Sequence, residues 1–188
     1  EDPTDVVESN IILPMELEKR RNGAVSIHLS SGIELLQPEH LYAATKGVAS
    51  KILSGKAHVL YLYTIWGGKH VQMNRFMSSL MKAGASGEPY TIETPYHTRD
   101  FVHIDRLLVL IESLLYDREW RTLHVGSGIP TAMLDVFRTL EGIARRKFDN
   151  VSVNAADRSS FLYYARGGAL PDTLYEDMER EWRVIIGT

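Results

Sequence analysis

The segment LSSGIELLQPEHLYAATKGVASKIL, residues 29–53, decides the fold that we predict for this chain of 188 residues. It begins at the end of an apolar run, AVSIHL, that is typical of a buried strand, and Ser31 follows this run closely. It continues with Tyr42 and Lys46, four positions apart, on a stretch with the apolar spacing of a helix. Small residues let this helix approach a sheet or a bound ligand closely: Ala43, Ala44, Gly47 and Ala49.

Helical and strand patterns alternate along the rest of the chain. Apolar residues recur at helical spacing in about 5–21, 39–54, 72–84, 104–116, 131–146 and 173–182. Short strands are predicted at AVSIHL, AHVLYLYTI, TLHVG and NVSVN. Because parallel strands need long crossovers that are usually helical, this alternation predicts an α/β fold with a mostly parallel sheet and flanking helices. Pro14 should kink or end the first helix.

The composition excludes several classes of function. The 21 basic and 24 acidic residues give a net charge of −3 without a long block of either sign, which argues against a nucleic-acid partner. Cys is absent, and the seven His lack the paired short spacings of a zinc site, so we expect no metal. The apolar runs are far shorter than the roughly 18 to 20 residues that span a bilayer. We therefore expect a cytoplasmic protein with no membrane partner.

Tyr42 and Lys46 are the residues that we single out for chemistry. On a helix, side chains four positions apart lie on one face, so the ammonium can approach the phenol. A nearby cation favours the ionised form of a phenol and makes it a better acid–base group near neutral pH. Ser31, at the end of the preceding strand, could then hydrogen-bond the same substrate oxygen. The alternative is an ordinary amphipathic helix with a packed tyrosine and a solvated lysine.

Several segments together resemble the extended short-chain dehydrogenases/reductases, a family that includes nucleotide-sugar epimerases, dehydratases and reductases. The resemblance is carried, in the family's order, by AVSIHLSS, YAATK, YTIWGG at 63–68, TRDFVHID at 98–105 and LHVGSGIPTAMLDV at 123–136. These segments cover most of residues 5 to 145. Their order is more specific than any single motif.

The resemblance implies a role for each matching residue. Tyr42 would be the catalytic acid/base and would also contact the cofactor. Lys46 would hold the nicotinamide ribose of NAD or NADP and take part in catalysis by tuning Tyr42. Ser31 would be both catalytic and substrate-binding. Arg99 and Asp100 stand in the family's RDF motif and would bind or frame the nucleotide-sugar, although a helix-start cap with an ion pair explains them equally well. Trp66 would form a wall of the substrate pocket.

The departures from the family pattern are as informative as the matches. Nothing upstream of Tyr42 can form the GxxGxxG turn that receives the cofactor pyrophosphate. The resemblance thus implies a partial Rossmann-like fold, with residues 1–66 as the C-terminal part of the dinucleotide-binding domain. Residues 67–188 would add a small substrate-binding lobe, with about 98–146 returning to the first part. The sheet would keep an open edge, which predicts a homo-oligomer or a second polypeptide that covers it.

Two smaller departures narrow the chemistry. Gly32 and Ile33 follow Ser31 where the family's sugar 4,6-dehydratases place an Asp-Glu pair, which disfavours that reaction. Only 11 positions separate Ser31 from Tyr42, which is shorter than usual and predicts a remodelled pocket. The sequence therefore favours an NAD(P)-dependent epimerase or reductase acting on a nucleotide-linked sugar. The alternatives are a non-catalytic relative that serves as a subunit or scaffold, and a nucleotide-sugar binding module.

Overall fold

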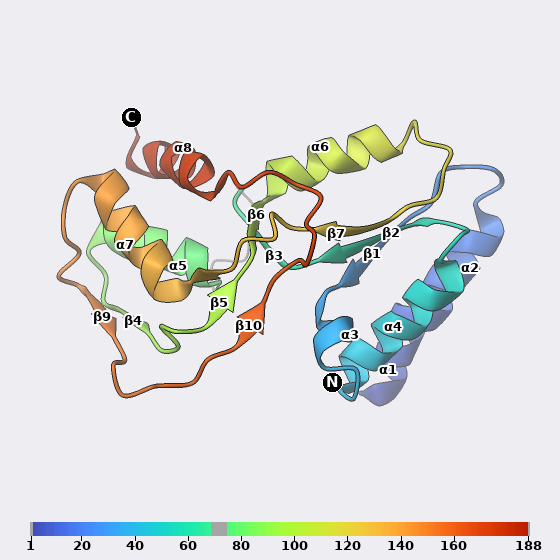
Figure 1. Ribbon diagram of the computed structural model, residues 1–188, viewed down its shortest axis with the longest axis horizontal. Helices are drawn as coiled ribbons and strands as arrows, with labels where there is room; N and C mark the ends of the chain where they lie inside the picture. Colours follow the sequence, from blue (N-terminus) through green and yellow to red (C-terminus); the bar gives the residue numbers. More distant parts are fainter. Residues whose placement is uncertain (1, 69–74, 188) are drawn as a thin grey trace.

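The computed structural model describes residues 2–68 and 75–187 and confirms the predicted α/β class (Figure 1). The helices are α1 (Pro3–Val7), the π-helical η1 (Glu8–Ile12), α2 (Leu13–Arg20), α3 (Ile33–Leu36), α4 (Leu41–Leu53), α5 (Phe76–Ser86), α6 (Ile104–Leu114), α7 (Met133–Ala144) and α8 (Leu174–Ile186). The strands are β1 (Ile27–Ser31), β2 (His58–Leu62), β3 (Thr64–Trp66), β4 (Tyr90–Ile92), β5 (Thr98–Arg99), β6 (Phe101–His103), β7 (Thr122–Val125), β8 (Thr131–Ala132), β9 (Val151–Val153) and β10 (Leu162–Tyr163).

The main sheet consists of β1, β2 and β7, which run parallel in the order β1-β2-β7. Helices cover both of its faces. Successive residues of a strand point to opposite sides, so neighbouring residues of β2 pack against different helices. Val59 packs with Leu53 of α4, whereas its neighbour Leu60 packs with Leu107 of α6. The outer edge of β1 has no partner strand within residues 2–68 and 75–187, as the sequence predicted.

The first helix continues past Pro14, where the sequence predicted either a kink or an end. The chain stays helical from α1 through η1 to α2, so the helix does not end there. Proline lacks an N–H and its ring collides with the preceding turn of a regular α-helix. The turn before Pro14 is π-helical instead, with the N–H of Leu13 donating to the carbonyl of Glu8. This wider turn also contains Asn10, whose side-chain amide donates to Thr45 Oγ1 of α4 at 3.0 Å.

A second lobe is built by α5, α7 and α8 around the parallel pair β4 and β9. Its core includes Leu80, Phe137 and Met178, one from each helix. The small sheet β10-β5-β8 and the pair β3 and β6 lie between this lobe and the main sheet (Figure 1). The domain boundary at residue 66 stays a prediction. The helix expected over 72–84 falls partly outside the described residues, and α5 begins at Phe76.

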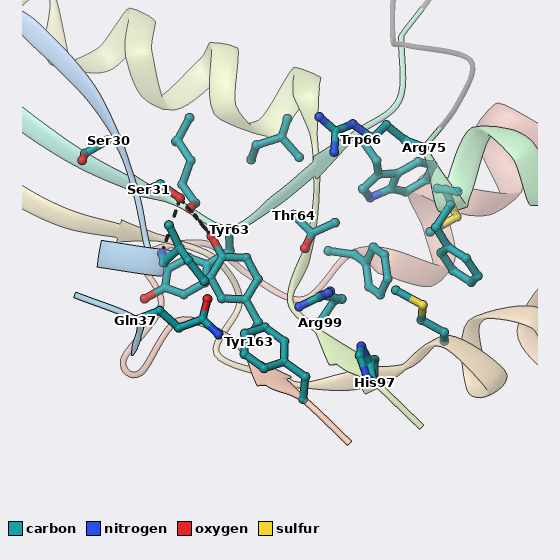
Figure 2. A pocket seen from close by; sticks show the side chains of 18 of the residues that line it. Ser30, Ser31, Gln37, Tyr63, Thr64, Trp66, Arg75, His97, Arg99 and Tyr163 are labelled. Atoms are coloured by element: carbon teal, nitrogen blue, oxygen red, sulfur yellow. Dashed lines mark hydrogen bonds between the residues drawn. The ribbon is translucent and has the colours of Figure 1, made fainter. Parts of the chain in front are cut away.

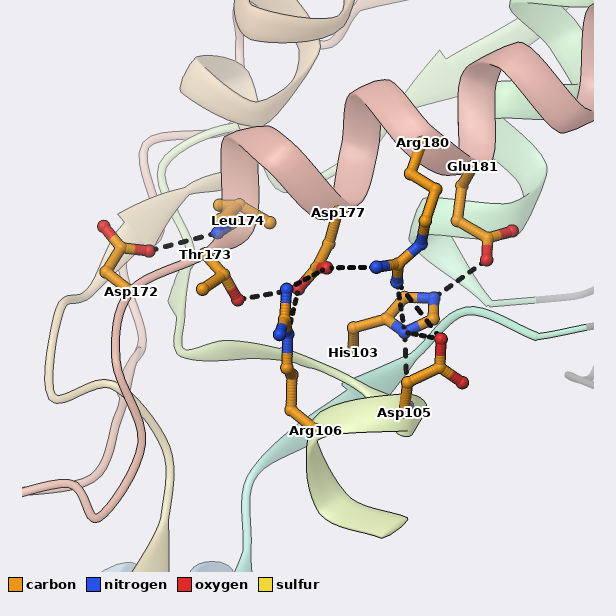
Figure 3. Close-up of polar contacts among 9 residues, drawn as sticks. All are labelled: His103, Asp105, Arg106, Asp172, Thr173, Leu174, Asp177, Arg180 and Glu181. Carbon is orange, nitrogen blue, oxygen red and sulfur yellow. Dashed lines mark hydrogen bonds and ion pairs between the residues drawn. The ribbon is translucent and has the colours of Figure 1, made fainter. Parts of the chain in front are cut away.

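A buried histidine joins α8 to β6 (Figure 3). His103 is 1% exposed, and its Nε2 lies 2.9 Å from Glu181 Oε1 of α8. Its Nδ1 accepts from the backbone N–H of Asp105 at 3.2 Å and faces an Arg180 nitrogen at 3.0 Å. Asp105 Oδ2 also lies 3.4 Å from Nδ1, so groups of α6 and α8 meet at this ring. Gly67 packs directly on this ring at φ +85°, where a Cβ would collide with it.

A buried carboxylate makes the second attachment of α8. Asp177 is 1% exposed and receives hydrogen bonds from Arg106 at 3.0 Å and Thr173 Oγ1 at 2.7 Å, with Arg180 as a further ion-pair partner at 3.0 Å. Burial opposes ionisation of this carboxyl. The hydrogen bonds from Arg106 and Thr173 outweigh burial and hold the pKa of Asp177 below its ordinary value.

Asp100 ties three distant segments together. Its side chain is fully buried and accepts from the N–H and hydroxyl of Ser127 at 2.9 and 3.1 Å, from Gly128 N at 2.9 Å and from Ala165 N at 3.1 Å. Gly126 must be glycine, because a Cβ there would collide with this carboxylate. One carboxylate thus joins the β5–β6 segment, the turn after β7 and the chain after β10.

We predict that acid weakens the wild type more than the variant Asp177→Asn. A carboxyl with a depressed folded pKa contributes stability above its ordinary pKa of about 4, and this is lost as the pH falls through the folded value. Urea unfolding at a series of pH values measures how steeply the free energy of unfolding of each protein depends on pH. Asp135→Asn, at an exposed carboxylate in an i,i+3 pair, is the control. If the free energy of unfolding depended on pH equally in the wild type and in Asp177→Asn, ionised Asp177 would not stabilise the fold as proposed.

We predict that Asp100→Asn lowers the free energy of unfolding by about 3 kcal/mol, because hydrogen bonds to a charged group are lost and an amide NH₂ faces backbone donors. Urea denaturation measures this. Asp135→Asn should change stability by less than about 0.5 kcal/mol, as exposed substitutions usually do. A similar small loss for both variants would show that the carboxylate does not hold the segments.

Candidate active site

One cavity of about 940 Å³ collects four of the residues predicted for the site (Figure 2). Ser31 ends β1, Tyr42 lies in the first turn of α4, Trp66 ends β3 and Arg99 ends β5, and all four line this cavity. The carboxyl end of a parallel strand and the following helix come to the same edge of a sheet, which explains the meeting of Ser31 and Tyr42.

Tyr42 and Lys46 lie on one face of α4, as their spacing predicted. Lys46 Nζ is 6.0 Å from the centroid of the Tyr42 ring and donates to the carbonyl of Leu29 at 3.3 Å. Burial lowers the pKa of Lys46, and the charge of Glu34 opposes this shift. Lys46 forms no ion pair within the described part of the chain, so its ammonium keeps donors for another group.

Ser31 has a partner that the sequence did not indicate. Its hydroxyl lies 3.2 Å from the phenol of Tyr163, from β10, and this phenol also donates to the carbonyl of Leu62 at 3.1 Å. Burial raises the pKa of Tyr163. The two residues are 132 positions apart and meet only because Tyr163 pairs with Arg99 in the parallel register of β10 and β5. No pattern in the sequence could have placed Tyr163 here.

A buried polar network lies behind the cavity. Ser30 Oγ donates to Glu34 Oε2, and Ser50 Oγ of α4 contacts both, at 2.9 Å from Ser30 Oγ and 3.2 Å from Glu34 Oε2. These contacts hold the short α3 against α4 and so fix the path between Ser31 and Tyr42. Burial, with a contribution from Lys46, lowers the pKa of the nearby His28 to about 4, so His28 is neutral at pH 7.

Arg99 provides a positive charge at the cavity wall. Its guanidinium lies over the rings of Phe161 and Tyr163, at 4.9 and 5.5 Å from their centroids. Burial lowers the pKa of Arg99, yet an arginine stays charged near neutral pH. No Asp or Glu stands among the residues that line the cavity, and Arg99 forms no ion pair with the described residues. This lining favours an anionic ligand.

Asp100 and Trp66 have environments that the sequence did not distinguish. Asp100 does not line the cavity, and its oxygens are occupied by backbone and hydroxyl donors. Of the two roles implied for Asp100, to bind or to frame the nucleotide-sugar, these contacts favour the framing role. Trp66 is 3% exposed, and its indole Nε1 has no hydrogen-bond partner among the described residues.

The described residues fit only part of a dinucleotide. Tyr42 and Lys46 offer a hydroxyl and an ammonium at the cavity and the β1 edge, which suits a nicotinamide ribose. The GSG turn after β7 does not suit a pyrophosphate, because the N–H groups of Ser127 and Gly128 already bind Asp100. In residues 2–68 and 75–187, no cluster of His, Asp and Glu could hold a metal, and no helix is both long and apolar enough to cross a bilayer.

Comparison with known proteins places this architecture among solved structures. No family model matches the sequence. A UDP-N-acetylglucosamine 4-epimerase from Methanobrevibacter ruminantium M1, in complex with UDP-N-acetylmuramic acid, has a TM-score of 0.79 and 15% identity, over 99% of this chain and 71% of that one. A UDP-glucose 4-epimerase from Thermotoga maritima, with UDP-glucose, has a TM-score of 0.76 and 16% identity, over 97% and 71%.

A variant UDP-glucuronic acid 4-epimerase from Bacillus cereus, in complex with UDP-4-deoxy-4-fluoro-glucuronic acid and NAD, has a TM-score of 0.73. Its sequence is 18% identical, over 94% of this chain and 67% of that one. At such identities the likeness establishes the fold alone. The resemblance inferred from the sequence is thus confirmed at the level of the fold, and nearly the whole chain has the architecture of part of a nucleotide-sugar epimerase.

Proposed function

We propose that this chain carries the substrate pocket and the acid–base residues of an NAD(P)-dependent epimerase or reductase that acts on a nucleotide-linked sugar. The observation that supports this best is that Ser31 and Tyr42, from different elements, line one cavity while Lys46 lies one turn behind Tyr42. An amphipathic surface helix alone would not bring a strand-end serine to the same cavity. The shared fold with sugar-nucleotide epimerases adds independent support.

Each residue has a distinct part in the proposed reaction. Tyr42 takes the proton from the sugar hydroxyl during oxidation and returns it during reduction, and its partial exposure leaves it accessible to a ligand. Ser31 accepts a hydrogen bond from this hydroxyl in the resting complex, before its proton turns to Tyr42. Lys46 binds the ribose of the cofactor and keeps a positive charge beside the phenol. The nicotinamide, when bound, accepts and returns the hydride.

Charge in the cavity supports a nucleotide-linked sugar as the substrate class. Arg99 presents an uncompensated guanidinium, and a guanidinium suits a phosphate through paired hydrogen bonds. The aromatic residues Phe101 and Phe161 line the same cavity and provide apolar walls for a sugar or a base. The Methanobrevibacter and Thermotoga structures each contain a bound UDP-sugar.

The open edge of β1 favours a second candidate function, a non-catalytic subunit or scaffold. An unpaired strand edge exposes backbone donors and acceptors that another strand can use. A homo-oligomer or a second polypeptide would cover it in either function. A nucleotide-sugar binding module without redox chemistry is a weaker alternative, because it gives Lys46 no task.

We predict that Tyr42→Phe lowers turnover at least 100-fold, because general acid–base catalysis contributes about 10² to 10⁴. The native polypeptide would be assayed with UDP-glucose and NAD, and with NADPH and the 4-keto sugar, following both products by chromatography. Thermal melting should be unchanged, because Tyr42 is 38% exposed. Tyr116→Phe, at a residue that is 82% exposed, is the matched control and should retain full turnover. Retained turnover in Tyr42→Phe would refute the catalytic role.

We predict that NAD or NADP raises the melting temperature of the native polypeptide. At a concentration of 100 Kd the cofactor adds about 2.7 kcal/mol, which corresponds to a shift of roughly 5 to 10 °C for a chain of this size. Lys46→Met should reduce the shift while leaving the cofactor-free melting temperature nearly unchanged. No shift with either cofactor, in the presence of any copurifying partner, would favour the scaffold.

A further inference from the structure

The carbonyl of Leu62 sets the direction of a short hydrogen-bond chain that ends in the cavity. It accepts from the backbone N–H of Gly32 at 2.8 Å and lies 3.1 Å from the phenol oxygen of Tyr163. A carbonyl oxygen can only accept, and its two lone pairs are filled by these two donors. The hydrogen bond to Leu62 therefore uses the proton of the Tyr163 hydroxyl.

The orientation of the Tyr163 hydroxyl also determines which way the Ser31 hydroxyl donates. The phenol of Tyr163 has a single proton, so toward Ser31 it can only accept. The Ser31 hydroxyl, 3.2 Å away, therefore donates to Tyr163. The N–H of Ile33 approaches the same serine oxygen at 3.4 Å, and a hydroxyl oxygen has two lone pairs. Ser31 thus has a lone pair left, and no proton, to offer to a ligand in the cavity.

Packing keeps Tyr163 in this position. Its ring lies 5.0 Å from the ring of Tyr63 and stacks on Phe161 at 6.1 Å, and Arg99 lies over it at 5.5 Å (Figure 2). Its backbone carbonyl accepts from Asp100 N at 3.0 Å, next to the carboxylate that binds the following segment. Because burial raises its pKa, the phenol keeps its proton near neutral pH and remains a donor to Leu62.

We propose that Tyr163 is a positioning residue that orients the Ser31 hydroxyl so that the site recognises a hydroxyl group on the sugar by accepting its proton. This rests on the proposed function, and it adds a specificity determinant from β10. The alcohol form of the sugar adds one donor to this series of hydrogen bonds. The sugar hydroxyl then donates to Ser31, Ser31 donates to Tyr163, and Tyr163 donates to Leu62. A group without a proton, such as a ketone or a fluorine, meets a Ser31 that has no proton to give.

The test compares two ligands that differ in one donor. UDP-glucose and UDP-4-deoxy-4-fluoro-glucose have similar shapes, and only the first can donate at position 4. Calorimetric titration of the wild type should show a preference for UDP-glucose of roughly threefold to tenfold, the size of one neutral hydrogen bond. In Tyr163→Phe, Ser31 is free to turn its proton toward the ligand, and the preference should fall to about twofold or less.

Matched variants separate orientation from general damage. Tyr164→Phe, at the next residue, should keep the wild-type preference, and Ser31→Ala should lose it as Tyr163→Phe does. A Tyr163→Phe variant that binds both ligands more weakly but keeps the wild-type preference would overturn the proposal, as would a wild type without a preference.

A neutron structure of the perdeuterated chain tests the same polarity without any ligand. The proposal expects the deuterium of Tyr163 on the line to Leu62 and that of Ser31 on the line to Tyr163. A Ser31 deuterium that points into the cavity would overturn it. If neither UDP-sugar binds the wild type, the proposed function fails, and the deuterium positions still decide whether Tyr163 orients Ser31.

Discussion

The buried carboxylate of Asp100 is the constraint on which the cavity depends. It is an ionisable group removed from solvent, and such a group is stable only when hydrogen bonds replace its water. Asp100 obtains these bonds from the turn after β7 and from the chain after β10. The same contacts fix the register that sets Tyr163 beside Arg99, and through it beside Ser31. A folding requirement thereby determines which groups face the ligand.

The wall of the cavity combines apolar rings with a single class of charge. Arg99 is only partly buried, stacks on Phe161 and Tyr163, and has no carboxylate partner among the described residues. Cation–π contacts offset part of the desolvation and leave the edge of the guanidinium available. The protein thus holds a positive charge ready for an anion, which fits a nucleotide-linked sugar better than a neutral one.

In the proposed function, the described residues supply only part of the cofactor site. Lys46 donates to Leu29 on the edge strand, while the glycine turn that might have served a phosphate is folded around Asp100. Under the proposed function, the groups that bind the remainder of the dinucleotide would be supplied at the open edge of β1 by the partner predicted there. This explains why the proposed chemistry and the predicted partner at that edge are linked: covering the edge and completing the cofactor site would be one event.

Local pattern was sufficient for the α/β class, for the parallel strands and for the pairing of Tyr42 with Lys46. Alternation of residues along a strand and the spacing of residues on a helix depend only on nearby sequence. Pro14 shows a limit of that reasoning, since a π-helical turn accommodates the proline where a kink or a helix end was expected. Asp100 shows a second limit. Arg99 and Asp100 are adjacent in one motif, yet Arg99 lines the cavity whereas Asp100 is buried against backbone donors.

Sequence by itself thus determined the order of elements and the residues on one helix face. Only the tertiary structure decided that Tyr163 touches Ser31, that Arg99 has no carboxylate partner in the part of the chain that is described, and that the GSG turn binds Asp100. These facts depend on contacts across 27 to 132 positions of chain, which arise from strand register and buried hydrogen bonds. No periodic pattern encodes such contacts, because they are set by the packing of the whole chain.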